Sequence, residues 1–416
     1  MNIILYENKR VEDLYPFSVM HCSWEIRAGA LSLFEKFQLF FPNSELFFKG
    51  RTKWVNSFLK RFDFVNNSLP DSDFLLLSGN FVLNTKSVKT INRLITENEC
   101  FILMTSEGKA FAFYTSDKKD QISKYIEGNE LIDLNDDVFD NYDRYIVDDV
   151  VEIEYIWDAV FINGKEINSD SEFFNQHHSL FLADYHGLQA INPNDIRIGN
   201  NVKISPSVVI DASEGKVLID DDVKIMPQAT ILGPCFIGKG TTVKIGAKIY
   251  GETSIGPMCK VGGEIENTII HAFSNKQHEG FLGHSYIGEW VNLGADTNNS
   301  DLKNTYGEIN MILPHKEVKS GRIFLGLMCG DHTKSGINTM FTTGTVAGTC
   351  AILVKEWFLP NFIKSFSWGG KSNSPAFRFH KAIETAKIVM QRRGKVLTEE
   401  EIELLRLEYE RICPSA

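Results

Sequence analysis

The chain lacks any long uninterrupted apolar run. No stretch approaches the roughly 18 consecutive apolar residues of a membrane helix, and the segment Met1–Glu7 reaches charged residues too early for a signal peptide. Its seven cysteines are an odd number, and two of them (Cys235 and Cys259) fall at positions expected to be buried, so we expect no structural disulfide. These absences favour a cytoplasmic protein that does not enter a membrane.

Excess positive charge is also missing. The sequence has 54 acidic residues against 43 basic ones, a formal net charge of -11 with histidine neutral. Such a balance argues against binding of nucleic acid or of an anionic membrane surface, because both attract proteins through basic patches. It does not exclude a local basic pocket for phosphate.

What the sequence does contain is a six-residue repeat. Large apolar residues recur at Ile198, Ile204 and Ile210, and the repeat resumes at Ile219 and continues every six residues to Val261. A small or branched residue follows four positions after each of these except Ile210, and turn-forming residues fill the gaps. This spacing predicts a hexapeptide parallel β-helix, in which each face of a triangular coil contributes one large and one small inward side chain. The alternative, a β-sandwich, is less consistent with it because sandwich strands alternate at period two.

Residues 1–190 have a different pattern. Short apolar runs at Ile3–Tyr6 and Phe74–Leu77 are separated by segments with helical spacing, at Gly29–Phe40 and Trp54–Phe64. Strands that alternate with helices predict an open α/β sheet. A hairpin with a glycine turn is expected at residues 101–113, and the acidic stretch 133–149 is expected to be a solvated loop or an exposed helix face.

We assign the coil to residues 191–355. Two passages, 268–287 and 298–322, break its rhythm and are expected to form loops outside the coil, where solenoids often bind ligands. Residues 356–416 are expected to be helical. Thr398 and Glu401 form a capping box at the start of the last helix, and we expect the two terminal helices to cover the last coil.

Specific motifs in both halves resemble a known family. They are Leu14–Ser18, Glu25–Gly29 and Ile156–Asp158 in the first half, and Gln277–Gly283, Asn292–Ala295 and Gly330–Asn338 in the second. The chain resembles the bifunctional N-acetylglucosamine-1-phosphate uridylyltransferase/glucosamine-1-phosphate acetyltransferase family, and looks closest to its divergent sugar-nucleotidyltransferase-like branch. The resemblance implies an α/β nucleotidyltransferase-like domain, a left-handed parallel β-helix and C-terminal helices. It also implies a homotrimer that uses acetyl-CoA and a sugar phosphate or nucleotide sugar, with Mg²⁺ at the N-terminal domain.

The resemblance implies that His278 is the general base of acyl transfer. An ammonium group cannot attack a thioester, and an imidazole with a near-neutral pKa can take the proton. Its polar neighbours predict that His278 is exposed, and Glu279 or Glu289 is expected to orient its ring. The alternative is a surface histidine without a role.

Further site residues follow from the same resemblance. Asn292, Phe281, Tyr250 and Arg27 are expected to bind the sugar substrate, Ala295 and Lys334 to bind acetyl-CoA, and Asp158 to bind the metal ion. The backbone N–H at Ala295 is suited to stabilise an oxyanion.

The sequence departs from the family at two places. The coil carries Tyr250 and Thr268 where the acetyltransferases grip a sugar phosphate with an arginine and a lysine, which favours a different or nucleotide-linked amino sugar. The N-terminal half lacks the glycine-rich phosphate loop after its first strand, since Glu7–Arg10 follows Tyr6. Side chains there keep the backbone farther from a triphosphate than glycines would.

Other functions remain open at this point. Nucleotidyl transfer is one, with the coil only forming the trimer, and a non-catalytic trimeric scaffold is another. His271, His278 and His284 also raise the possibility of a zinc site with three histidine ligands.

Overall fold

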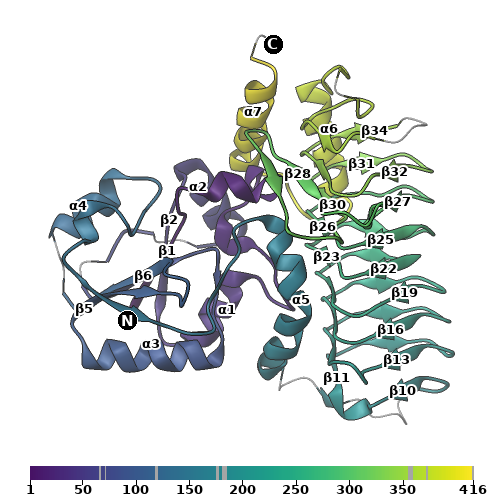
Figure 1. Cartoon of the computed structure of the whole chain (residues 1–416). Helices are drawn as coiled ribbons and strands as arrows, with labels where there is room; N and C mark the ends of the chain where they lie inside the picture. The colour runs from purple at the N-terminus through teal and green to yellow at the C-terminus, as the bar shows by residue number, and fades with distance from the viewer. Residues whose placement is uncertain are drawn as a thin grey trace.

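The computed structural model describes residues 1–64, 67–70, 72–117, 120–174, 178–179, 185–354, 359–371 and 373–414. Figure 1 shows an α/β domain on one side, a tall stack of short strands on the other, and helix α5 (Ile156–Asp170) between them. Helices α6 (Phe379–Gln391) and α7 (Glu399–Ile412) lie near the top. This confirms the α/β domain, the parallel β-helix and the C-terminal helices predicted from the sequence.

The N-terminal domain is built on a mixed six-stranded sheet with the order β2-β1-β3-β6-β5-β7. Strand β6 runs antiparallel to both neighbours and the other pairings are parallel. The strands and the α-helices around them are β1 (Asn2–Tyr6), β2 (Glu45–Lys49), β3 (Phe74–Ser78), β5 (Cys100–Met104), β6 (Ala110–Thr115), β7 (Asp143–Ile146), α1 (Leu33–Phe40), α2 (Thr52–Arg61), α3 (Thr85–Glu97) and α4 (Asp120–Gly128). A short pair, β4 (Phe81–Val82) with β8 (Val151–Glu152), flanks the sheet.

The expected hairpin is confirmed as β5–β6, and both expected helices are present with slightly shifted bounds. The prediction that the acidic stretch 133–149 is a solvated loop or an exposed helix face was wrong. The stretch contains the edge strand β7 and buries Phe139 and Val147, because apolar residues between the aspartates reach the core below the sheet edge. A count of acidic residues does not reveal this.

The coil consists of three sheets in which each strand of the coil pairs in parallel with the strand one turn later. Ile210, Ile231, Ile249, Ile265 and Leu282 therefore stack in register inside the coil, which is the physical origin of the repeat. We call the ten-stranded sheet the domain face: β9 (His178–Ser179), β11 (Ile196–Ile198), β14 (Val217–Ile219), β17 (Cys235–Ile237), β20 (Thr253–Ile255), β23 (Ile269–Ile270), β26 (Tyr286–Ile287), β30 (Leu327–Cys329), β33 (Thr345–Ala347) and β35 (Phe362–Ile363). The edge strand β9, which precedes the coil, instead pairs antiparallel with β11. Such stacked sheets are typical of a left-handed β-helix.

The other two sheets are narrower. The lysine face comprises β12 (Lys203–Ile204), β15 (Lys224–Ile225), β18 (Thr242–Val243), β21 (Lys260–Val261) and β24 (Asn275–Lys276), continued by β31 (Lys334–Ser335) and β34 (Ile352–Leu353). The third face comprises β10 (Gln189–Ile191), β13 (Val209–Asp211), β16 (Thr230–Leu232), β19 (Lys248–Ile249), β22 (Glu264–Glu266) and β25 (Phe281–Gly283), continued by β27 (Asn298–Asn299) and β32 (Met340–Phe341).

The domain face is apolar on both sides. Its outward residues include Phe236, Ile269, Tyr286, Met328 and Val346, all buried, and four of them belong to or contact the core of the N-terminal domain. On the lysine face the corresponding outward positions are mostly lysine, threonine or asparagine. Burial of apolar area therefore determines which side of the coil the N-terminal domain covers.

The two irregular passages behave differently. Residues 268–287 stay in the coil and form β23, β24, β25 and β26, so the prediction of an external loop there was wrong. The six-residue period is lost because each of these turns contains fewer residues than three six-residue steps would give. In the passage 298–322, Asn298–Asn299 form β27 of the coil, and the residues after it leave the coil through the hairpin β28 (Asn310–Ile312)–β29 (Glu317–Lys319). It buries Met311 in the core of the N-terminal domain.

The terminal helices do not simply cover the last coil, which corrects that expectation. Helix α7 packs on α2 of the N-terminal domain. Helix α6 packs beside Trp290, and Arg393 after it donates to the carbonyl of Met258 at 2.9 Å, several turns down the coil. The capping box of α7 is confirmed, since Thr398 Oγ1 accepts the N–H of Glu401. The expected boundary at 355 and 356 lies outside the described residues.

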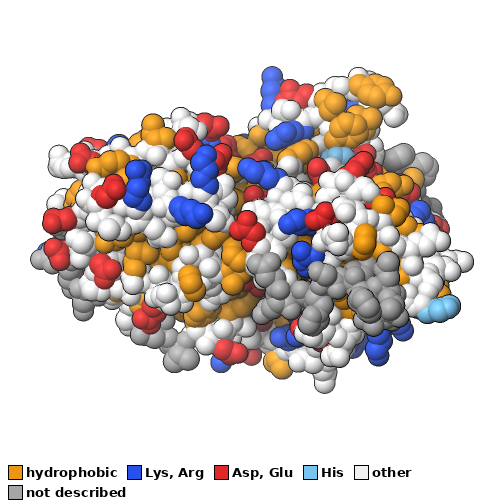
Figure 2. All heavy atoms as spheres, turned by 90° about the horizontal axis from the view of Figure 1, so that it is seen from below, with side chains coloured by type: hydrophobic (Ala, Val, Ile, Leu, Met, Phe, Trp, Pro, Cys, Tyr) orange, Lys and Arg blue, Asp and Glu red, His pale blue; other side chains and the backbone are white. Residues whose placement is uncertain are grey.

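None of the described helices combines the length and the apolar character needed to cross a membrane. On the face shown in Figure 2, acidic and basic side chains are intermixed over the visible surface. That face offers no extended basic area of the kind that binds nucleic acid.

We predict that Gly256→Ala destabilises the protein by about 3 kcal/mol or more. A Cβ at this position would lie 1.8 Å from the carbonyl oxygen of His271 on the next turn, so the stack would have to open. Gly128→Ala is the control, because a Cβ there meets nothing within 4 Å, and we expect a change within about 0.5 kcal/mol. Urea unfolding of both variants measures the difference, and equal midpoints would contradict the prediction.

Candidate functional sites

One corner of the coil, where the lysine face turns into the third face, gathers four of the residues expected to act in acyl transfer. Asn275, Asn292 and Lys334 pair laterally on successive turns. After them, the N–H of Asp296 donates to the carbonyl of Glu279 at 3.0 Å. His278 and Ala295 therefore lie at equivalent positions of neighbouring turns, with Asn292 and Lys334 beside them.

Lys276 holds the turn that carries His278. Its side chain points into the coil, in register with Val261, and is buried. Lys276 Nζ donates to the carbonyl of His278 at 2.6 Å and to that of Glu279 at 3.1 Å. Burial lowers the pKa of Lys276 to about 8. His278 is exposed on this fixed turn, as predicted.

The lysine face beside this corner is cationic. Arg393, which follows α6, donates to Asn275 Oδ1 at 3.0 Å and lowers the pKa of Lys260 by repulsion. Lys334 is half-buried; burial lowers its pKa, and its Nζ donates to the carbonyl of His332 at 2.8 Å. Asn275 Nδ2 reaches Asn292 Oδ1 at 3.4 Å. The corner therefore joins a histidine, amides and cations.

The expected sugar-binding residues of the coil are more scattered. Phe281 is half-buried on the third face, directly after the His278 turn. Tyr250 is on the same face, 37% exposed, but it follows β19, two strands away in that sheet. Thr268 is fully buried and hydrogen-bonds within the coil, so it is not available to a substrate. Of Phe281, Tyr250 and Thr268, only Phe281 directly follows the His278 turn.

Glu289 does not orient His278, which corrects one of the two alternatives. It lies at the junction with the N-terminal domain, 3.6 Å from His271 Nε2. Glu279 is next to His278 and its Oε2 lies 3.3 Å from Lys248 Nζ.

The three-histidine zinc hypothesis was wrong for the described residues. His271 is buried against Tyr286, His284 Nδ1 pairs with Asp301 at 2.8 Å, and His278 is exposed at the lysine-face corner. The seven- and six-residue spacings place these rings at different corners of the coil.

In the N-terminal domain, a cleft of about 280 Å³ lies at the carboxyl edge of the sheet. It is lined by the loop after β5, by the start of α5 with Asp158, and by Arg322 from the coil. Asp158 Oδ2 accepts the N–H groups of Glu154 and Tyr155 at 3.1 and 2.8 Å, and burial raises its pKa to about 6. Asp158 thus caps α5.

The donors in this cleft do not fit a magnesium ion. Glu152 and Glu154 are paired with Lys109 at 2.6 and 3.4 Å, and Arg10 also contacts Glu154. Magnesium needs carboxylates that are free to face it, and these are neutralised by cations. Across the described ranges no three-ligand group forms in this cleft.

The position after the first strand is occupied by a carboxylate. Glu7 is fully buried and accepts N–H groups from Ser23 and Arg51, and its Oε1 lies 2.8 Å from Arg51 Nη2. The side chain that follows the first strand is therefore committed to a buried ion pair. Arg27, expected to bind substrate, instead donates to the carbonyls of Ala30 and His271 and so joins the domains.

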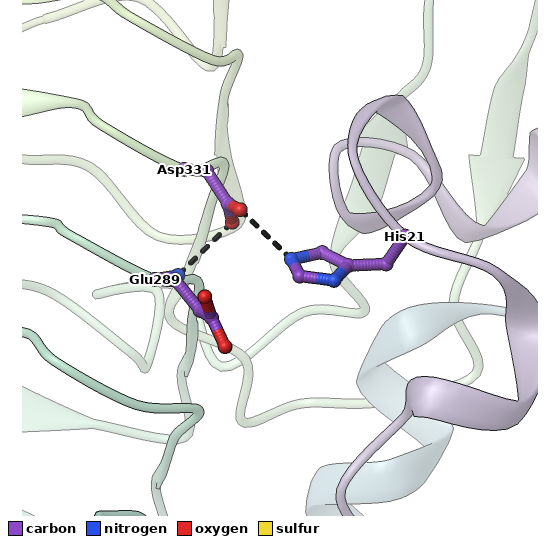
Figure 3. A group of neighbouring side chains, drawn as sticks. All are labelled: His21, Glu289 and Asp331. Atoms are coloured by element: carbon purple, nitrogen blue, oxygen red, sulfur yellow. Dashed lines mark hydrogen bonds and ion pairs between the residues drawn. The ribbon is translucent and has the colours of Figure 1, made fainter. Parts of the chain in front are cut away.

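A buried polar cluster lies where the N-terminal domain meets the domain face. Figure 3 shows His21 pointing at Asp331, with Glu289 below them; His21 Nε2 lies 2.8 Å from Asp331 Oδ2. Burial lowers the pKa of His21, but Asp331 and Glu25 outweigh it and raise the pKa to about 10. Burial raises the pKa of Glu289 to about 7.

Sequence reasoning missed His21, Lys276 and Arg393. For Lys276 there was a signal, because it stands at an inward position of the coil where the neighbouring turns have valine. His21 and Arg393 gave none, since their partners are remote in the chain.

The structure joins an α/β domain to a stacked coil with an exposed histidine, and comparisons with known proteins show what the chain is similar to. Residues 3–179 match the model of a protein family described as sugar nucleotidyl transferase. The bifunctional sugar-1-phosphate nucleotidylyltransferase/acetyltransferase of Sulfurisphaera tokodaii is 26% identical over 307 residues, covering 68% of this chain and 73% of that protein. Bifunctional protein GlmU of Methanococcus aeolicus is 25% identical over 315 residues, covering 71% and 74%.

Residues 3–179 thus resemble a sugar nucleotidyl transferase domain, and about 70% of the chain aligns with distant relatives that are named as bifunctional sugar-1-phosphate nucleotidylyltransferase/acetyltransferases or GlmU proteins. A solved UDP-N-acetylglucosamine acyltransferase from Arabidopsis is 16% identical with a TM-score of 0.29, over 56% of this chain and 84% of that one. That score is too low to support an argument.

We predict that Lys276→Met removes a pH dependence of stability. The folded-state pKa is about 8 and that of an unfolded lysine is about 10.4, so the unfolded chain binds more protons between these values. The free energy of unfolding of the parent protein therefore rises with pH across this window, by up to about 3 kcal/mol. The methionine variant should lack this increment in urea unfolding from pH 7.5 to 10.5. An unchanged profile would contradict the prediction.

Proposed function

We propose that the coil transfers an acetyl or similar acyl group from acetyl-CoA to the amine of an amino sugar, at the corner that carries His278. The observation that carries the proposal is the exposed His278 on a turn fixed by Lys276, beside Ala295 and Asn292. A base must be both accessible and held in place to take a proton from an incoming amine.

His278 takes a proton from the attacking amine while the nitrogen forms a bond with the thioester carbonyl carbon. The Ala295 N–H, which donates to no acceptor within the described ranges, is positioned to stabilise the oxyanion that develops. When the carbon–sulfur bond breaks, His278 returns the proton to the coenzyme A thiolate. The amide product and free coenzyme A then leave.

The cations on the lysine face support coenzyme binding. Lys260, Arg393 and Lys334 lie on one side of the corner and suit the phosphate groups of coenzyme A. Asn292 and Phe281 are proposed to contact the sugar, and Tyr250 lies farther along the same face.

A homotrimer is proposed from the distribution of apolar side chains. The domain face is covered by the N-terminal domain, so on the coil itself the lysine face and the third face are left to meet other copies. Ile337, 73% exposed, stands at the His278 corner, and Ile245 and Met340 are also exposed there. Exposed apolar side chains gathered on one side are typical of an interface. We also propose that the protein is located in the cytoplasm.

The N-terminal domain is proposed to bind a nucleotide sugar or sugar phosphate in the cleft at the carboxyl edge of its sheet. Lys109 and Arg322 line it and suit phosphate oxygens. The Glu7–Arg51 pair speaks against nucleotidyl transfer as the main activity, because it occupies the place of the phosphate loop. That activity and a non-catalytic scaffold are the alternatives that the experiments below separate.

We predict that His278→Ala lowers acyl transfer by about 10²- to 10⁴-fold, as expected for loss of a general base. Release of coenzyme A from acetyl-CoA, measured with free and nucleotide-linked amino sugars, follows the reaction. His380→Ala is the control, since His380 is exposed on α6, and it should retain full activity. A fully active His278→Ala enzyme would rule out the proposed base, and an inactive parent protein would favour the scaffold.

We also predict that nucleotide sugars raise the thermal midpoint of the protein more than nucleoside triphosphates do. A ligand that binds only the folded state stabilises it, and at equal concentration the tighter ligand stabilises it more. Lys109→Met should reduce this shift, because it removes a cation from the cleft. A larger shift with triphosphates would instead support nucleotidyl transfer.

A further inference from the structure

Three side chains from two domains converge at the junction cluster. His21 comes from the N-terminal domain, and Glu289 and Asp331 come from successive turns of the coil (Figure 3). One potential ligand atom of each lies within 4.8 Å of the others, and it is the one such group among the described ranges. An imidazole nitrogen and two carboxylate oxygens form a donor set suited to a divalent transition metal.

The ring of His21 is oriented by a second carboxylate. His21 Nδ1 lies 3.2 Å from Glu25 Oε2, and Glu25 is itself held by Arg61 at 2.7 Å and by the N–H of Cys22 at 2.8 Å. Glu25 therefore accepts the Nδ1 proton, so that Nε2 is directed at Asp331. A histidine whose other nitrogen donates to a carboxylate is the usual arrangement around protein-bound metals.

The two carboxylates from the coil each have an oxygen that could bind a metal ion. Asp331 Oδ1 accepts the backbone N–H of Glu289 at 3.0 Å, which leaves Oδ2 facing His21. The carboxylate of Glu289 accepts no hydrogen bond within the described ranges, and its one ion-pair contact there is with His271 Nε2 at 3.6 Å. Its side chain is 17% exposed, so this partly desolvated carboxylate has no strong donor and a cation would pair with it.

The cluster is reachable from solvent. Glu25, His271 and Glu289 line a cleft of about 360 Å³ between the N-terminal domain, the coil and the C-terminal helices. An ion can therefore reach Glu289 without the domains separating, and a water molecule from the cleft can occupy the remaining coordination position.

We propose that His21, Glu289 and Asp331 bind one divalent transition-metal ion, with Zn²⁺ the best match, which joins the N-terminal domain to the coil. The ion replaces the proton that His21 otherwise shares with Asp331, so binding releases that proton. A water molecule completes the coordination, and Glu25 keeps the imidazole in the tautomer with Nε2 unprotonated. The site is independent of the proposed acyl transfer.

The test uses the full-length protein, stripped with a chelator and then dialysed against Zn²⁺ or Co²⁺ at pH 8. We expect about one tightly bound metal ion per chain by elemental analysis, and a visible absorption spectrum for the Co²⁺ form. Zn²⁺ should also raise the thermal midpoint.

Glu289→Gln and Asp331→Asn keep the shape of each side chain and should weaken binding by about 10-fold or more. Glu279→Gln and His380→Ala are the matched controls, since both residues are exposed on the coil or on α6, and they should bind as the parent does. Circular dichroism establishes that each variant is folded. Less than about 0.1 ion per chain in the parent protein overturns the proposal. The proposal is also overturned if Glu289→Gln and Asp331→Asn bind the metal ion as tightly as the parent protein does, because the ion would then be bound elsewhere.

Discussion

The structure depends on one constraint, the burial of both sides of the domain face. A parallel β-helix needs only its interior covered, but here outward residues such as Phe236, Tyr286 and Met328 are apolar as well. Exposure of this apolar outer surface to water would be unfavourable, so α5 and the N-terminal domain pack against the domain face. The hairpin β28–β29 adds to the same contact by burying Met311 in that domain. The two domains are therefore one packed unit rather than two modules on a linker.

This packing determines where chemistry can occur. With one face covered, the lysine face and the third face are those left to bind substrates and other copies, and His278 lies at the corner between them. The same packing brings α6 down the side of the coil, so that Arg393 reaches Asn275. At the covered face it encloses polar groups that would otherwise be solvated, and His21, Glu25, Glu289 and Asp331 form a network that spans the junction.

Prediction from the sequence succeeded where the signal was local and periodic. Stacked turns impose the same inward side chains every six residues, so the coil was readable from Ile219 onward. The start of α7 was readable from Thr398 and Glu401, which are three residues apart. Prediction failed where one residue was lost from a turn, as between Ile265 and Ile287, because the fold tolerates a shorter turn that breaks the period. Arg27 was misassigned because a buried arginine bound to carbonyls looks, in sequence, like one that binds phosphate.

The sequence by itself determined the coil, its inward core and the exposure of His278, since each follows from spacing along a few neighbouring residues. Only the tertiary structure decided that Glu7 occupies the place of a phosphate loop, that Lys276 holds the His278 turn, and that Glu289 faces away from it. The pairing of His21 with Asp331 spans 310 positions of the chain. Such contacts are selected by the packing of whole faces against each other, and no local pattern records which distant side chains that packing brings together.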